Sequence, residues 1–387
     1  MKILLLHNRY QIPGGEDVVA QAEKTLLEDN GHSVAWLEVN NDDITGIWSQ
    51  IKTAANTIYS YSSKKQVSEI IASFHPDIVH IHNFFPLLSP AVYDACQEAG
   101  IPVVQTLHNY RLLCPNAEFF RDGGVCEDCL GKVIPLPGVI HSCYRGNRAA
   151  TAAVAAMLSF HRIRGTWRDR VNSYIALNEF AREKFIAGGL PPDKIVVKPN
   201  FLHPDPGVGT GTGGYGLFVG RISQEKGLDT LIAAWKHLGG KTPLKIVGDG
   251  PQAFRVAEVV KDLPGIELLG RLSQKEVLDL MKEALVLIFP SLWYEGFPMT
   301  IVEAYAVGVP VIASQIGSLS SLMDSYRTGI HFRPGDAEDL AAKVEWTLSH
   351  PAELSQMRRN ARAEFEGKYT AKANYQKLIE IYQEMMA

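Results

Sequence analysis

The strongest constraint on the fold is a repeated alternation of short apolar runs, rich in β-branched residues, with stretches of helical periodicity. In the first half of the chain we expect strands at Ile3–Leu6, Ser33–Val39, Ile78–Ile81, Val103–Leu107, Tyr174–Leu177 and Ile195–Lys198. In the second half we expect them at Gly216–Val219, Leu244–Val247, Ile266–Leu269, Leu285–Phe289, Val309–Ala313 and Gly329–Phe332. Strands that alternate with helices pair in parallel through crossover connections. The sequence therefore predicts an α/β protein with doubly wound parallel sheets.

The two series of strands are separated by residues 203–214, which are rich in Gly and Pro. This composition is typical of a linker that does not pack. We therefore expect one domain at 1–202 and a second at 215–370, consistent with a length of 387 residues. Beyond Phe332 the pattern is helical, with candidates at 336–349, 351–366 and 371–385. In tandem, the two sheets are expected to turn their strand carboxyl ends, where ligands bind in such folds, toward a shared cleft.

Composition limits the functional classes. A formal net charge of -4 argues against a nucleic-acid partner. No apolar stretch is long enough to span a bilayer, and the apolar run after Met1-Lys2 is too short for a signal peptide. Five cysteines without a signal indicate a reducing compartment rather than a disulfide framework, so we expect a cytoplasmic protein.

The most informative local feature is a pair of acids, Glu295 and Glu303, after the strand Leu285–Phe289. Pro298 suits the first position of a helix. The free amides of that first turn would then suit an anion such as a diphosphate, with the two carboxylates binding neutral groups such as sugar hydroxyls. These amides belong to Met299, Thr300 and Ile301. The pattern indicates a nucleotide-sugar site; an ordinary helix start with an acidic residue is the alternative.

Two cations follow the first strand of the second half. Arg221 and Lys226 would suit a diphosphate leaving group, although either alone could be surface charge. Residues 248–251 read as a turn with a capping Asp249. Arg271 and Leu272 follow the next strand, where the backbone could contact a nucleotide base.

The first half offers weaker signals. Gly14 and Gly15 precede a helix and would let backbone approach a phosphate or a sugar, although a plain turn explains them too. Their spacing is not that of a dinucleotide-binding loop. His108 follows the fourth strand and could hydrogen-bond substrate hydroxyls or stabilise developing charge; a structural role is the alternative. His80 and His82 are similar candidates with a stronger structural alternative.

In combination these motifs resemble the family-4 retaining glycosyltransferases of the GT-B fold. The resemblance rests on Gly220-Arg221 to Lys226-Gly227, Val247 to Pro251, Glu295-Gly296-Phe297-Pro298 to Glu303-Ala304, Gly14-Gly15 and His108. It implies two Rossmann-like domains facing an interdomain cleft: an acceptor domain first, a donor domain second, and a last helix (371–387) packed back on the first. It also implies transfer from a UDP-, GDP- or ADP-sugar to a saccharide or lipid-linked acceptor. The transfer would retain configuration, need no catalytic metal, and serve bacterial cell-surface polysaccharide or glycolipid synthesis.

The resemblance also implies individual roles. Arg221 and Lys226 would bind the diphosphate, Glu303 the ribose hydroxyls and Glu295 the donor sugar. Gly15 would contact phosphate and His108 the transferring sugar. Backbone contacts to sugar and phosphate are implied for Gly296, Phe297, Met299 and Thr300. Two other functions stay open at this stage: a nucleotide-sugar epimerase on the same fold, and a non-catalytic nucleotide-sugar-binding subunit.

Two further segments carry chemistry of their own. The insert 110–147 contains Cys114, Cys126, Cys129 and Cys143, which could form a structural tetrahedral zinc site or remain free thiols. Residues 145–170 carry six arginines against one aspartate around an apolar helical stretch. That segment could lie on an anionic membrane surface, and the alternative is a core helix with solvated basic ends.

Overall fold

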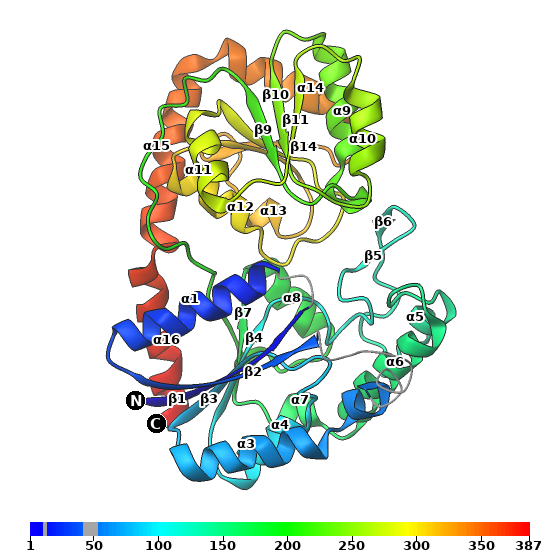
Figure 1. The fold of residues 1–387 in the computed structure, drawn as a ribbon, viewed down its shortest axis with the longest axis vertical. Helices are drawn as coiled ribbons and strands as arrows, with labels where there is room; N and C mark the ends of the chain where they lie inside the picture. The colour runs from blue at the N-terminus through cyan, green and yellow to red at the C-terminus, as the bar shows by residue number, and fades with distance from the viewer. Residues whose placement is uncertain (11–13, 42–52) are drawn as a thin grey trace. The chain divides into compact units, whose positions relative to one another are not determined.

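Two six-stranded parallel sheets, one in each of two units, form the framework of the computed structural model (Figure 1). The structure describes residues 1–10, 14–41 and 53–387. Unit 1 comprises Met1–Phe119, Cys126–Asn200 and Asn374–Ala387. Unit 2 comprises Phe120–Val125 and Phe201–Ala373.

The sheet of unit 1 has the order β2-β1-β3-β4-β7-β8. Its strands are β1 (Lys2–Arg9), β2 (Ser33–Asn40), β3 (Ile78–Asn83), β4 (Val103–Leu107), β7 (Ser173–Ala176) and β8 (Ile195–Val197). Helices α1 (Gly15–Asp29), α3 (Tyr61–Phe74), α4 (Ala91–Glu98), α8 (Glu179–Ala187) and α16 (Ala371–Met386) accompany them. Leu378, Ile381 and Tyr382 of α16 share one buried cluster with Ile3 and Leu5 of β1. The chain reverses its direction of strand addition between β1 and β3, where ligands bind in such sheets.

The sheet of unit 2 has the order β11-β10-β9-β12-β13-β14. Its strands are β9 (Gly216–Val219), β10 (Leu244–Val247), β11 (Ile266–Gly270), β12 (Val286–Phe289), β13 (Val311–Ser314) and β14 (Gly329–Phe332). Its helices are α9 (Leu228–Leu238), α10 (Ala253–Val260), α11 (Gln274–Glu283), α12 (Met299–Ala306), α13 (Leu319–Leu322), α14 (Ala337–Ser349) and α15 (Pro351–Lys368). Two buried apolar clusters line this sheet. The switch point lies between β9 and β12.

All twelve predicted strands and the three C-terminal helices are present, and the predicted doubly wound α/β fold is confirmed. Sequence reasoning did not find the hairpin of β5 (Phe120–Arg121) and β6 (Gly124–Val125), because two-residue strands leave no periodicity to recognise. The insert also contains α5 (Leu136–Ile140), followed by α6 (Arg148–Ile163) and α7 (Thr166–Asp169).

The expectation that residues 203–214 cannot pack is wrong. This segment belongs to unit 2, and the amides of Gly209, Gly211 and Gly213 each donate a hydrogen bond of 2.9 Å to a backbone carbonyl. A Cβ at Gly209 would lie 2.2 Å from the carbonyl oxygen of Lys282. The glycines therefore allow the backbone to approach neighbouring chain closely, and they do not make the segment flexible.

Asp249 is not a helix cap, because α10 begins after Gln252. Its carboxylate instead accepts a hydrogen bond from the Gly250 amide at 2.7 Å.

Candidate functional site

The loops that follow β9 and β12 are locked together at the switch point of unit 2. The amide of Leu292 donates to the carbonyl of Glu225 at 2.8 Å. Gly227 has φ +72°, and a Cβ there would lie 1.9 Å from the carbonyl oxygen of Pro290. Only glycine fits such a position without displacing the backbone. This close approach fixes the backbone positions from which the side chains of both loops extend.

Lys226 and Glu295, one from each loop, form an ion pair. The Lys226 Nζ lies 2.8 and 3.1 Å from the two carboxylate oxygens of Glu295. The carboxylate also accepts from Ser291 Oγ at 2.5 Å, and Ser318 Oγ donates to the Glu295 carbonyl at 2.7 Å. Glu295 is only 5% exposed. Sequence reasoning assigned these residues to different parts of a ligand; the structure joins them directly.

The other cation of the first loop is differently placed. Arg221 is exposed, and its guanidinium forms no ion pair with any residue that the structure describes. The loop behind it is tightly packed, since a Cβ at Gly248 would lie 1.8 Å from the carbonyl oxygen of Gly220. Arg271 is exposed as well, whereas Leu272 packs against the apolar cluster of α12. Arg221 is therefore available to a ligand.

Helix α12 starts one residue later than the sequence indicated. Pro298 is its N-cap, and the Ile301 amide donates to the Pro298 carbonyl at 3.0 Å, so that amide is not free. The amides of Met299 and Thr300 remain at the open start of the helix, where no earlier helical carbonyl can accept from them. Phe297 packs on the apolar cluster, 6.2 Å from the ring of Tyr369.

Glu303 lies on the second turn of α12. Gln274 Nε2 donates to its carboxylate at 3.3 Å. Partial burial raises the pKa of the Glu303 carboxyl above its ordinary value, and the Gln274 hydrogen bond opposes this shift. A carboxylate with few protein partners beside an open helix start is suited to accept hydroxyl hydrogen bonds.

In unit 1 the predicted residues lie near the switch point of the first sheet. Gly14 caps α1, and its amide donates to Asp17 Oδ2 at 2.6 Å. Gly14 and Gly15 are exposed, and a Cβ at Gly14 would meet only Asp17 Oδ2, at 3.9 Å. The surrounding protein therefore does not itself demand glycine at this position.

His108 follows β4 and is partly exposed. Its Nε2 lies 3.1 Å from Nδ1 of the buried His82. Burial of the ring lowers the pKa of His108 to about 3, and the nearby His7 and Lys198 add smaller contributions in the same direction. The imidazole is therefore neutral near pH 7. Of the two roles expected for it, hydrogen bonding to hydroxyls fits better than stabilisation of negative charge.

Two family models match this chain, "Glycosyltransferase Family 4" over residues 14–205 and "Glycosyl transferases group 1" over residues 211–364. The chain belongs to glycosyltransferase family 4. A glycogen synthase of Mycobacterium tuberculosis is 34% identical over 152 residues, which are 38% of this chain and 36% of that protein. The D-rhamnosyltransferase WbpZ of Pseudomonas aeruginosa is 32% identical over 159 residues, 40% of this chain and 41% of that protein. The matched part is less than half the length of each of these relatives.

Solved structures show the same fold over the whole length of this family-4 chain. A glycosyltransferase of Rickettsia africae superposes with a TM-score of 0.70 at 19% identity, covering 100% of this chain and 98% of the other. Anabaena Alr3699/HepE in complex with UDP-glucose superposes with a TM-score of 0.68 at 18% identity, covering 99% and 100%. This likeness confirms the GT-B fold that the sequence motifs implied.

Sequence reasoning missed Glu16, the second residue of α1. Its two carboxylate oxygens accept from Asn83 Nδ2 and Asn109 Nδ2, each at 3.1 Å. Burial raises the pKa of the Glu16 carboxyl to about 7, with His7 opposing the shift and Asp17 adding to it. Two sequence signals could have pointed to Glu16. It directly follows the glycine pair, and an asparagine stands at the end of each of two neighbouring strands.

Replacing Glu16 with glutamine is expected to stabilise the fold near pH 8 and to change little near pH 4. Between about pH 4.3, the ordinary value, and the folded pKa of about 7, the folded protein binds more protons than the unfolded chain. Stability contributed by this residue therefore falls as the pH rises through that window. Glutamine has no such dependence. Urea denaturation of both proteins across the window tests this; an equal effect at both ends would contradict it.

The four cysteines of the insert gather around Cys129. Burial raises the pKa of the Cys129 thiol to about 11, and Cys114, Cys143 and Cys126 add to the shift. In the described part of the chain, however, the residues whose ligand atoms all lie within 4.8 Å of one another are Glu23, His80 and His82, and no cysteine is among them. Zinc binding by the insert therefore stays a prediction.

If the insert binds zinc, the purified protein should contain about one equivalent per chain, and binding should release protons because thiolates are the ligands. Metal analysis by mass spectrometry measures the content. The control is Cys96→Ser, since this buried cysteine lies in α4 outside the insert. Loss of zinc in Cys126→Ser but not in Cys96→Ser would support the site, and a metal-free wild type that takes up no added zinc would contradict it.

Helix α6 contributes to the core of unit 1. Val154, Met157 and Leu158 are buried on one of its faces. Several of the arginines counted in 145–170 are engaged within the protein: Arg162 with the Leu112 carbonyl, Arg164 and Arg170 with Asp94, and Arg168 with Asp169. Arg145 and Arg148 are exposed. Among the described helices, none has the length and hydropathy needed to cross a membrane.

Proposed function

We propose that this chain transfers a sugar from a nucleoside-diphosphate sugar to a saccharide or lipid-linked acceptor. The proposal includes retention of configuration, no catalytic metal, and a role in bacterial cell-surface polysaccharide or glycolipid synthesis. The observation that carries it is the Lys226–Glu295 pair beside the open start of α12, with Arg221 exposed in the same loop system.

The chemistry of donor cleavage matches these groups. When the bond between the sugar and the diphosphate breaks, negative charge develops on the leaving oxygen. A fixed ammonium, an available guanidinium and helix-start amides stabilise such charge. Glu295 holds the Lys226 ammonium in one place. Its role toward the donor sugar is carried over from the family resemblance. Glu303, farther along α12, suits the ribose hydroxyls. Retention itself is carried over from the family resemblance.

Relatives and structural neighbours support the choice of ligand. The HepE structure contains UDP-glucose, and WbpZ is named a D-rhamnosyltransferase. A nucleoside-diphosphate sugar is therefore the donor class to test first. On the side of unit 1, His108, Gly15 and Glu16 offer groups for the transferring sugar or the acceptor.

The first experiment is a thermal-shift screen with UDP-, GDP- and ADP-sugars, since a ligand at 100 times its Kd adds about 2.7 kcal/mol of stability. The stabilising donor is then incubated with and without saccharide acceptors, and the products are analysed. An acceptor-linked product that keeps the anomeric configuration of the donor would show retaining sugar transfer. A changed nucleotide sugar formed without acceptor would instead show an epimerase. Tight binding with no transfer and no slow donor hydrolysis would show a binding subunit.

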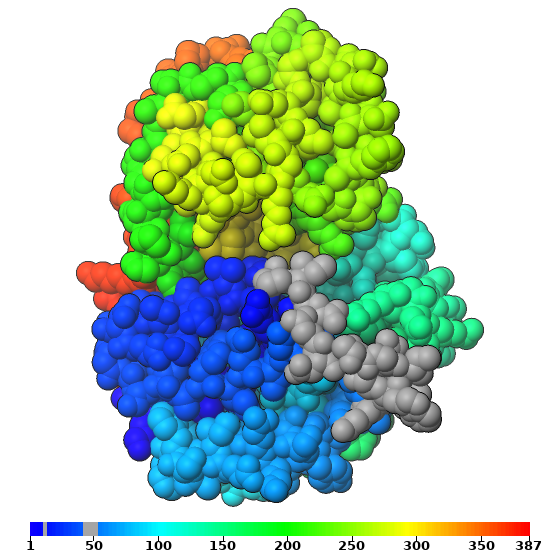
Figure 2. All heavy atoms as spheres, viewed as in Figure 1, coloured from blue at the N-terminus to red at the C-terminus, as the bar shows by residue number. Residues whose placement is uncertain are grey.

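We also propose that the α5–α6 region contacts the anionic surface of the cytoplasmic membrane. Helix α5 packs against α6, and both lie at the surface in Figure 2, in teal and green. Large apolar side chains are exposed there: Val133, Ile134, Leu136, Ile140, Phe160 and Ile163. The exposed Arg145 and Arg148 precede or open α6. Exposed apolar side chains beside arginines are the combination that binds anionic lipid at the interface.

The double substitution Ile134→Ser and Ile163→Ser is expected to reduce sedimentation of the protein with phosphatidylglycerol vesicles severalfold. The control is Phe254→Ser, which removes an even more exposed apolar side chain from α10 of unit 2. Binding should also weaken with salt, because surface charges are screened. Equal binding to phosphatidylcholine vesicles, or no binding to either kind, would contradict an anionic membrane contact.

A further inference from the structure

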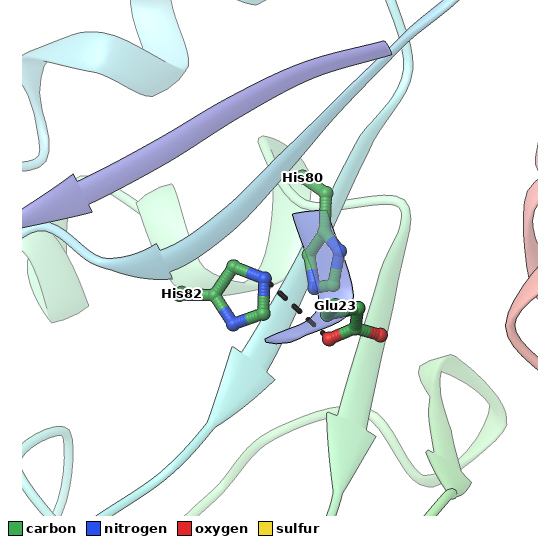
Figure 3. A group of neighbouring side chains, drawn as sticks. All are labelled: Glu23, His80 and His82. Carbon is green, nitrogen blue, oxygen red and sulfur yellow. Dashed lines mark ion pairs between the residues drawn. The ribbon is translucent and has the colours of Figure 1, made fainter. Parts of the chain in front are cut away.

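A buried polar network lies directly behind His108 in unit 1. Glu23 extends from α1, and His80 and His82 extend from β3, so that the three side chains face one another (Figure 3). All three are at most 2% exposed. Such groups are costly to bury unless each is matched to a partner. Their arrangement therefore has to be explained by the partners that they have.

A metal is not the matching partner. Glu23 already faces a cation, because the Nζ of Lys198 lies 3.1 Å from Glu23 Oε1. Both ring nitrogens of His80 are already hydrogen-bonded, Nδ1 to Tyr382 OH at 2.7 Å and Nε2 to Thr106 Oγ1 at 2.8 Å. The Lys198 ammonium neutralises the Glu23 carboxylate, so the network needs no further positive charge.

The proton positions follow from the neighbours of His82. Its Nε2 lies 3.5 Å from Glu23 Oε2 and has no hydrogen-bond partner among the described residues. A ring lone pair facing a carboxylate would be repelled, whereas an N–H is attracted. His82 therefore carries its proton on Nε2, and its Nδ1 is an acceptor. The hydrogen bond of 3.1 Å between the two rings must then be donated by His108 Nε2.

We propose that Glu23 and His82 are positioning residues that hold His108 in its Nε2–H tautomer, so that Nδ1 of His108 accepts a hydrogen bond from a sugar hydroxyl. His108 is partly exposed, and no described residue hydrogen-bonds its Nδ1. The pKa of His108, lowered to about 3, agrees with a neutral acceptor near pH 7. The identity of the hydroxyl rests on the proposed glycosyltransferase function; the tautomer does not.

The tautomer can be measured without any substrate. Long-range proton–nitrogen NMR of protein with ¹⁵N-labelled histidine distinguishes a protonated ring nitrogen from an unprotonated one. The His108 signals are assigned by their loss in His108→Gln. We expect Nδ1 of His108 to be unprotonated and Nε2 protonated near pH 7. A wild-type His108 that carries its proton on Nδ1 would overturn the proposal.

Glu23→Gln gives the second test. The glutamine carbonyl is expected to face Lys198 and its amide group to donate to His82 Nε2. His82 then carries its proton on Nδ1, and His108 is forced into the Nδ1–H tautomer. Tyr382→Phe is the control, because it removes a partner of His80 from the same buried region but leaves the bond from His82 to His108 intact. Its His108 tautomer should match the wild type.

Activity gives a separate readout. With a working transfer assay, kcat/KM is expected to fall about tenfold in Glu23→Gln, the effect of one mismatched hydrogen bond, and to stay near wild type in Tyr382→Phe. A switched tautomer with unchanged transfer would show that His108 does not accept from the substrate, which would overturn its role. If wild-type protein transfers no sugar at all, the proposed function fails while the NMR result still decides the tautomer.

Discussion

Lys226→Met is expected to lower kcat/KM for sugar transfer by about 100- to 1,000-fold, the loss seen when one fixed group that stabilises developing charge is removed. In the structure this ammonium is held 2.8 Å from a Glu295 carboxylate that is itself almost fully buried. Methionine keeps the approximate length of the side chain but removes the fixed cation that would stabilise the departing diphosphate. The loss should appear in kcat more than in KM, because the charge develops in the transition state.

The control for this prediction is Lys275→Met, which removes an exposed lysine from α11 of the same unit. It should leave transfer near the wild-type rate. Glu295→Gln separates the two partners, since it keeps Lys226 charged but loosens its position. If Lys226→Met transfers sugar at the wild-type rate, Lys226 is a structural partner of Glu295 and the proposed leaving-group role is wrong.

The second large effect concerns stability. Lys198→Met is expected to lower the free energy of unfolding of unit 1 by about 3–5 kcal/mol, because it leaves Glu23 as a buried charge without its cation. The pair is separated by 3.1 Å, and both side chains are 1% exposed. Lys198 Nζ also donates to Asn374 Oδ1 at 3.2 Å, which connects the pair to α16. Urea denaturation followed by circular dichroism measures the change.

Two comparisons identify the cause. The double substitution Lys198→Met with Glu23→Gln should recover more than half of the lost stability, because no unpaired charge is then buried. Lys24→Met disrupts an ion pair in the same helix, Lys24–Glu28 at 2.7 Å, but on the surface. It should cost at most about 1 kcal/mol. A double variant no more stable than Lys198→Met alone would indicate that lost packing, rather than an uncompensated charge, causes the effect.

Local patterns predicted the framework well. The strands of a doubly wound sheet are short apolar runs buried on both faces, so each is visible in the sequence without knowledge of its neighbours. The sequence also places Arg221, Lys226 and Glu295 near the switch point, since they lie in the loops that follow two of these runs. The role of the glycines in 203–214 was misread, because composition does not distinguish flexibility from close packing.

Partnerships between distant residues were not predictable. Nothing in the sequence indicates that Lys226 meets Glu295, 69 positions later, rather than the diphosphate alone. Glu23 of α1, His82 of β3 and Lys198, directly after β8, likewise come from three separate parts of the chain. Glu16 appeared to be a routine acid in a first helical turn. Its raised pKa depends on burial that only the packed loops create.

The sequence by itself determined the fold class, the two sheets, the family and the residues that stand at the strand ends, because all of these depend on patterns within short segments. The tertiary structure decided which of those side chains are paired, which are buried and which nitrogen of His108 has a partner. These properties depend on distances of about 3 Å between residues far apart in the chain, and such distances exist only after the elements have packed.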